Sequence, residues 1–379
     1  MSRYAPYSVV SKVSKSGRSF SGALHIYTKE EASSQFEFFV HQVEAVLTPL
    51  FEFLPVNGEV YFAFVGDGQP YKASLLDKDI FVILIDVRAL DYLFTFAARL
   101  QVIGPLAARF GAQRVEPTKN YEGQYLLDIA KDVIFHPELV LESCQANSSN
   151  IISLSLLAYV IAHEYAHIAH GHLDLFASAH FQKFALDEAD RDLTFRTLEM
   201  DADASAATST HTLFEGFWKS EIAPKLTAEE QVERSALYRL RYLIGITLAH
   251  IYLDSLAGPE VPNKHPVTYF RYSAFLSVLR SVITSRGDFE PIVLEEARLL
   301  VVNTFAHLSG AASDLGHPIA ANIQITERED RLRTEYSSIG EAMALEEMAQ
   351  YGGRWSKLYP YLANYLRGGR LAPPYAEPL

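Results

Sequence analysis

The stretch from Ile151 to His172, IISLSLLAYVIAHEYAHIAHGH, constrains this chain more than any other part of its sequence. Its first half is almost wholly apolar or small, which predicts a helix buried on most sides. The residues just before it, 147–150 (NSSN), offer turn and N-cap chemistry, so we expect the helix to begin near Ile151. Burying ionisable side chains costs free energy unless they are paired. The ionisable residues at the end of this stretch should therefore have partners or a ligand.

That charged end is an HExxH pattern formed by residues 163–167. Residues four positions apart on an α-helix lie about 40° apart on one face, so His163 and His167 can direct two imidazoles at one metal ion. Glu164 is the adjacent carboxylate that can deprotonate a water activated by the metal. Imidazole and carboxylate ligands favour Zn2+, so the pattern predicts a zinc site. The alternative is a pair of histidines on a solvated helix face.

Catalytic zinc sites use three protein ligands and keep one position open, so a third ligand must come from elsewhere. The segment EMDAD provides Glu199 and Asp203, four positions apart on one face of a predicted helix over 193–210. We expect Glu199 to bind zinc and Asp203 to accept a hydrogen bond from the far nitrogen of a ligand histidine. The alternative for Glu199 is a solvated acidic face.

Two local alternatives for the third ligand are weaker. His170 points away from His167 around the helix, and His172 follows Gly171, so its use would require the helix to break. The longer HExxHxxGxxH pattern is not met either, because Leu173 occupies the position of its last histidine.

Composition bounds the function classes. The 379 residues carry a formal net charge of -13 and no basic stripe, which argues against a nucleic-acid partner. The single cysteine, Cys144, cannot form an internal disulfide. We see no signal-peptide pattern and no uninterrupted apolar run of membrane-spanning length, so we expect no membrane span and a cytoplasmic location.

Hydrophobic periodicity predicts an α+β chain. We expect an N-terminal α+β region over 1–125, a metal-binding core over 126–285 and a helical extension over 286–379. Residues 1–30 read as a loose arm or an added strand. The expected strands are a hairpin formed by 60–65 and 71–75, a strand at 80–86 and a strand at 132–135. The strand at 132–135 is either an exposed edge with which an extended substrate could pair or an ordinary internal strand. The expected helices are 33–54, 90–110, 151–172, 193–210, 227–258, 267–285, 291–308, 338–351 and 356–366. The segment 227–230 (TAEE) fits a capping box at the start of the helix over 227–258.

HEYAHIAHGH followed by EMDADASA resembles the gluzincin metallopeptidases, which carry HExxH followed by ExxxD. The resemblance is closest to the HtpX-like, ImmA/IrrE-like and Lit-type phage-exclusion peptidases, and covers about residues 130–275. It implies a zincin-like core, with a small sheet packed on the HExxH helix, and a zinc endopeptidase acting on a specific intracellular protein in regulation or phage defence. HtpX-like members are usually membrane-embedded, which this chain does not resemble.

The segment Asn263-Lys264-His265-Pro266 with Arg271 is similar to the HP…R segment of the HtpX-like group. The resemblance implies that His265 and Arg271 lie near the catalytic cleft, where they could stabilise an oxyanion. Three tyrosines are equally open candidates for that role: Tyr165, Tyr269 and Tyr272.

A different class of function also fits the motif. The chain could be a non-catalytic, zinc-containing binding or scaffold protein with a vestigial peptidase site. Retention of Glu164 argues against this reading, because a structural site has four protein ligands and needs no base.

Overall fold

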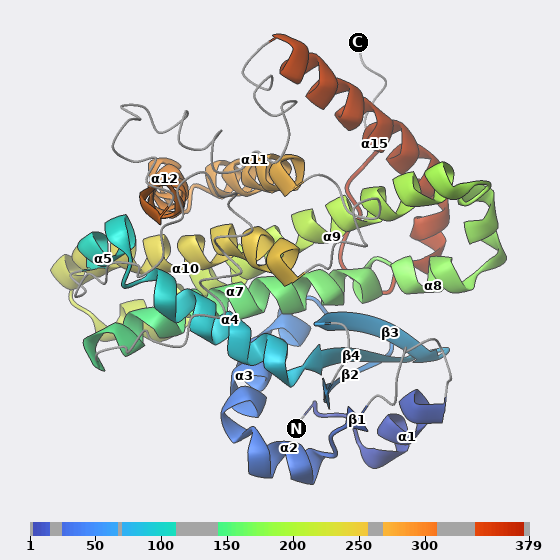
Figure 1. Cartoon of the computed structure of the whole chain (residues 1–379), viewed down its shortest axis with the longest axis horizontal. Helices are drawn as coiled ribbons and strands as arrows, with labels where there is room; N and C mark the ends of the chain where they lie inside the picture. Colours follow the sequence, from blue (N-terminus) through green and yellow to red (C-terminus); the bar gives the residue numbers. More distant parts are fainter. Residues whose placement is uncertain are drawn as a thin grey trace.

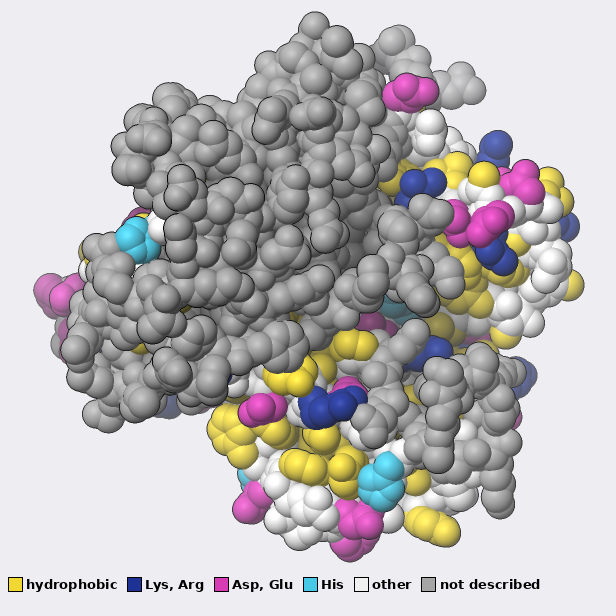
Figure 2. All heavy atoms as spheres, in the orientation of Figure 1, with side chains coloured by type: hydrophobic (Ala, Val, Ile, Leu, Met, Phe, Trp, Pro, Cys, Tyr) yellow, Lys and Arg dark blue, Asp and Glu magenta, His cyan; other side chains and the backbone are white. Residues whose placement is uncertain are grey.

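The computed structural model describes residues 3–15, 25–66, 70–110, 143–256, 268–308 and 338–374. Over these residues the chain is mostly helical with one small mixed sheet, which confirms the predicted α+β class. On the face drawn in Figure 2, acidic and basic side chains are interspersed among the described residues.

The sheet has four strands in the order β1-β2-β4-β3. Their bounds are His25–Ile26 (β1), Glu59–Gly66 (β2), Tyr71–Asp77 (β3) and Ile80–Asp86 (β4). β2 runs parallel to β4, with Val60 opposite Phe81, and β3 runs antiparallel to β4, with Ala73 opposite Ile83. The predicted hairpin of 60–65 with 71–75 is therefore wrong, because β4 lies between these strands. β1 pairs with β2, so the N-terminal region supplies an added strand.

Strand burial explains this order. Every residue of β4 after Ile80 is buried, as expected for a central strand covered on both faces. In β3 only Tyr71 and Ala73 are buried and the other residues are partly or fully exposed, which suits the edge of a sheet. A tight turn at Lys78 and Asp79 joins β3 to β4, and this short connection brings the two together.

Helices at the N-terminal end cover the sheet (Figure 1). They are α1 (Tyr7–Lys15), α2 (Lys29–Gln35), α3 (Glu37–Phe53) and α4 (Val87–Leu100). α5 (Gly104–Phe110) lies away from the sheet and packs on the helix formed by Ile292–Leu308. The helix expected over 33–54 is split at Phe36, because Thr28 and Glu31 form a capping box that begins a separate short helix. The helix expected over 90–110 is interrupted at residues 101–103.

α7 (Ser143–Ala169) is the central helix, and it carries the HExxH pattern. It begins at Ser143, so the expected start near Ile151 is wrong and residues 147–150 lie inside the helix. Figure 1 shows the sheet on one side of α7 and two long helices, α9 (Glu188–Phe217) and α10 (Ala228–Leu256), on the other. The predicted capping box at the start of α10 is present, formed by Thr227 and Glu230.

One described helical segment, Ile151–Ala169, is long and apolar enough to cross a membrane by length and composition alone. Of its most apolar window, 83% is buried inside the fold. Core helices of folded proteins meet the same length and composition test, so this segment carries little information about a membrane.

α7 and α10 cross at Gly245. A Cβ atom built on Gly245 would lie 1.9 Å from Ser155 Oγ and 2.4 Å from the carbonyl oxygen of Ile152. The absence of a side chain therefore lets the two backbones approach closely, and this contact sets the position of α7.

The remaining helices are α8 (His172–Ala177), α11 (Thr268–Arg286), α12 (Ile292–Leu308) and α15 (Ser338–Tyr365), with a 3-10 helix at Ala179–Phe184. α11 packs on α9 and α12 on α10 (Figure 1). The helices expected over 338–351 and 356–366 are one continuous helix, α15, which packs on α8 and α9. α9 is longer than the expected 193–210, and the expected strand at 132–135 lies outside the described residues.

The segment after α15 ties the end of α7 to the sheet. The backbone N–H groups of Arg367 and Gly368 donate to the carbonyl oxygen of Ala169 at 2.8 and 2.9 Å. The Arg367 guanidinium also contacts Asp174 in α8, at 2.7 Å, and Asp79 in the β3–β4 turn, at 2.6 Å. These bonds satisfy carbonyl groups that a helix end leaves without intrahelical partners.

Candidate metal centre

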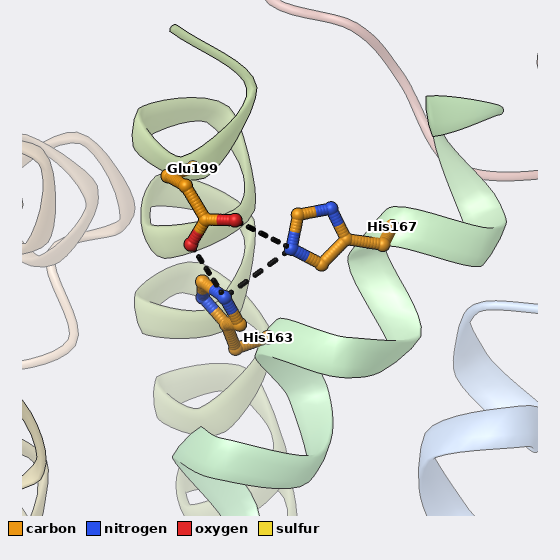
Figure 3. Close-up of side chains that lie close together, drawn as sticks. All are labelled: His163, His167 and Glu199. Atoms are coloured by element: carbon orange, nitrogen blue, oxygen red, sulfur yellow. Dashed lines mark hydrogen bonds and ion pairs between the residues drawn. The ribbon is translucent and has the colours of Figure 1, made fainter. Parts of the chain in front are cut away.

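α7 and α9 bring the three expected ligands together. His163 Nε2 lies 3.3 Å from His167 Nε2 and 3.2 Å from Glu199 Oε2, while His167 Nε2 lies 3.5 Å from Glu199 Oε1 (Figure 3). The two histidines are one turn apart on α7, and Glu199 points at them from α9. The predicted pairing of HExxH with a glutamate from another helix is thus present in the geometry.

The size of this triangle suits a tetrahedral cation. Zinc–nitrogen bonds of about 2.0–2.1 Å place two tetrahedral ligands about 3.3 Å apart. All three measured separations lie within 0.2 Å of that value (3.2, 3.3 and 3.5 Å), so the side chains fit a zinc ion without rearrangement. Both imidazoles are buried, and Glu199 is 16% exposed.

Asp203 takes the position expected of it. Its Oδ1 lies 2.9 Å from His163 Nδ1, the nitrogen on the far side of the ring from Glu199. Asp203 is in turn held by the hydroxyl of Tyr159, which also lies 2.9 Å from His250 Nε2. A carboxylate that accepts the Nδ1 proton leaves Nε2 free to bind a cation and fixes the orientation of the ring.

Glu164 faces the sheet. Its Oε2 accepts a hydrogen bond of 2.5 Å from the backbone N–H of Ala73 in β3. The catalytic carboxylate proposed from the sequence therefore lies between the metal-binding triangle of α7 and the edge strand of the sheet. The sequence leaves open whether an edge strand at 132–135 lies beside the site, and it does not identify β3 as the neighbouring edge.

Of the further candidates, Tyr165 does not join this cluster, and the side chains of the others lie outside the described residues. Tyr165 is buried on another side of α7, where its hydroxyl donates to the carbonyl oxygen of Leu54 at 2.6 Å, so it is wrong as an oxyanion donor. His265 lies outside the described residues. The backbone of Arg271 belongs to α11, and its side chain lies outside the described set, as do the side chains of Tyr269 and Tyr272.

His170 and His172 also lie apart from the triangle. They form a second buried group with Asp201, an acid of the EMDAD segment for which the sequence analysis predicts no role. The helix does break at Gly171, which has a φ of 76°, but the break brings His172 beside His167 rather than beside the other ligands. The sequence signal for this second group is the close spacing of three histidines in one segment (His167, His170 and His172) and of three acids in another (Glu199, Asp201 and Asp203).

The charges in the site favour a bound cation. Burial opposes protonation of His163, but Asp203 and Glu199 outweigh it and raise the pKa of His163 to about 10. Burial lowers the pKa of His167 to about 3. The carboxylates therefore hold a proton on His163 in the metal-free chain, and an incoming metal ion would displace that proton.

Comparison with known proteins adds no relative: no family model, no curated protein and no solved structure matches the chain. The interpretation of the site therefore rests on its own geometry.

Proposed function

We propose that this chain is a zinc-dependent endopeptidase of the gluzincin type, acting on a specific intracellular protein. The observation that carries the proposal is the buried triangle of His163, His167 and Glu199 at tetrahedral spacing, with Glu164 next to it on the same helix. The packing of a small sheet against the HExxH helix supports a zincin-like core.

In this proposal His163, His167 and Glu199 hold the zinc ion. Zinc, when bound, polarises the scissile carbonyl and lowers the pKa of a water molecule. Glu164 accepts the proton of that water and delivers it to the leaving amine. Asp203 keeps His163 in the tautomer that presents Nε2 to the metal.

The edge strand β3 supports a peptide as the substrate. β3 is the last strand in the sheet order, and the N–H of Ala73 points away from β4 toward Glu164. An extended peptide that paired with this edge would run past the carboxylate that acts as base. The substrate would then displace the hydrogen bond between Ala73 and Glu164, which frees the carboxylate for proton transfer.

The decisive experiment compares newly formed protein N-termini in cells that express the wild-type chain or Glu164→Gln, with zinc measured in both purified proteins. We expect both to bind one zinc ion and only the wild type to generate new N-termini. One or a few cleavage sites would identify a selective protease and its target. Equal zinc content with identical N-termini would refute the peptidase proposal and favour a non-catalytic zinc-binding protein.

A further inference from the structure

The second buried group is connected to the metal-binding triangle through His167. His167 Nδ1 lies 2.9 Å from His172 Nδ1, and His172 Nε2 lies 3.2 Å from Asp201 Oδ2. Asp201 Oδ2 is also 2.5 Å from His170 Nδ1. A continuous row of polar contacts therefore runs from the triangle through His172 and Asp201 to His170, all within the buried interior.

Tautomers determine the direction of these contacts. A metal ion bound by His167 Nε2 requires the proton of that ring to be on Nδ1. The facing nitrogen, His172 Nδ1, must then accept this proton, so His172 carries its own proton on Nε2, facing the carboxylate of Asp201. Asp201 favours this arrangement electrostatically, because its carboxylate oxygen lies 3.2 Å from His172 Nε2 and an ionised carboxylate has no proton to donate.

A metal ion bound by the second group (His170, His172 and Asp201) would reverse these proton positions. Coordination by His172 Nε2 would move the His172 proton to Nδ1, and His167 Nδ1 would have to accept it. The proton of His167 would then lie on Nε2, where it opposes metal binding in the triangle. His170 Nδ1 and Asp201 Oδ2 also lie much closer together than the roughly 3.3 Å that separates two ligands of one tetrahedral ion.

We propose that His172, oriented by Asp201 and His170, is a positioning residue that holds His167 in its metal-binding tautomer, so that the chain binds one zinc ion and not two. This inference rests on the proposed metal centre. It gives each ligand histidine a separate support: Asp203 for His163, and His172 for His167. Gly171 permits it, because its positive φ turns the chain so that His172 returns to His167.

The test measures zinc stoichiometry and affinity by chelator competition, and the absorption spectrum of the cobalt-substituted protein. We expect His172→Phe, which keeps a ring but removes the acceptor, to lower zinc affinity by about 10- to 100-fold and to change the cobalt spectrum. His172→Asn keeps an acceptor near the Nδ1 position and should restore most of both. Asp201→Asn should weaken binding less than His172→Phe.

His211→Phe is the matched control. His211 is a fully buried histidine with a carboxylate partner, Asp288, at 3.0 Å, and it lies on α9 about 18 Å beyond Glu199. Like His172→Phe, the control His211→Phe removes a buried imidazole, so it should lower the unfolding midpoint of the metal-free protein. It should leave the zinc affinity and the cobalt spectrum unchanged.

Different outcomes separate the two proposals. Wild-type affinity and spectrum in His172→Phe would overturn the positioning role while leaving the peptidase proposal intact. Two tightly bound zinc ions in the wild type, one of which is lost in His172→Phe, would overturn it in favour of a second metal site. A wild-type chain that binds no zinc would refute both. Zinc binding that depends on His172, without proteolysis, would support the positioning role and refute only the peptidase.

Discussion

Replacing Gly245 by alanine tests the crossing of α7 and α10, on which the position of the metal-binding helix depends. Moving the new Cβ atom from 2.4 Å to about 3.4 Å from the Ile152 oxygen requires the backbones to separate by about 1 Å. Rotation of the Ser155 hydroxyl, whose oxygen is the nearest atom, cannot relieve the clash alone, because the Ile152 carbonyl oxygen is also too close and belongs to the backbone. Overpacking of this kind costs up to about 3 kcal/mol, and the helix propensity of alanine returns about 1 kcal/mol. We expect a net loss of about 2 kcal/mol.

Equilibrium denaturation followed by circular dichroism measures this loss, and Gly216→Ala supplies the control. Gly216 is also inside a long helix, α9, but a Cβ atom there would meet nothing within 4 Å. Its replacement should therefore stabilise the protein by about 0.5–1 kcal/mol. If Gly245→Ala were as stable as Gly216→Ala, the close approach of α7 and α10 would be wrong.

Three further changes probe the metal site, the C-terminal segment and a buried histidine. Glu199→Gln removes a charged ligand and should lower zinc affinity, measured by chelator competition, by more than about 100-fold. That value is the largest loss expected when only a residue hydrogen-bonded to a ligand is removed. Unchanged affinity would exclude Glu199 as a ligand. Arg367→Ala leaves the partly buried Asp174 without its cation and should lower the free energy of unfolding by about 2 kcal/mol in chemical denaturation, whereas a loss below about 0.5 kcal/mol would show that the contact contributes little. Burial lowers the pKa of His211 although Asp288 opposes it, so the unfolded chain takes up a proton first. Stability should therefore fall as the pH drops below about 6.5, by up to about 1.4 kcal/mol per pH unit from this group, and His211→Asn should reduce that slope; an identical slope would contradict the burial effect.

The features that sequence reasoning predicted correctly depend on local geometry. His163 and His167 face the same way because they are one helical turn apart, and Glu199 and Asp203 share a face for the same reason. The capping box at Thr227 likewise involves residues three positions apart. In each case a short-range rule fixes the relation between the side chains before any tertiary contact forms.

The features that it missed depend on long-range contacts. The order of the sheet follows from the parallel pairing of β2 with β4, and periodicity within each strand says nothing about its neighbour. The role of His172 required knowledge of where α7 ends. That end is set by Gly171 and by backbone bonds from Arg367 and Gly368, far along the chain. A helical wheel that continues past Ala169 places His172 incorrectly, because the chain turns at Gly171.

The attachment of the C-terminal segment also makes local opening of the molecule cooperative. Arg367 joins α7, α8 and the β3–β4 turn, and it lies 288 positions from Asp79 in the chain. Opening of this segment would break contacts to all three elements together, so we expect the amide groups at the end of α7, in α8 and in the β3–β4 turn to exchange hydrogen with a common opening free energy. α8 begins at His172, so the same local opening would also reach the buried histidines beside the metal-binding triangle.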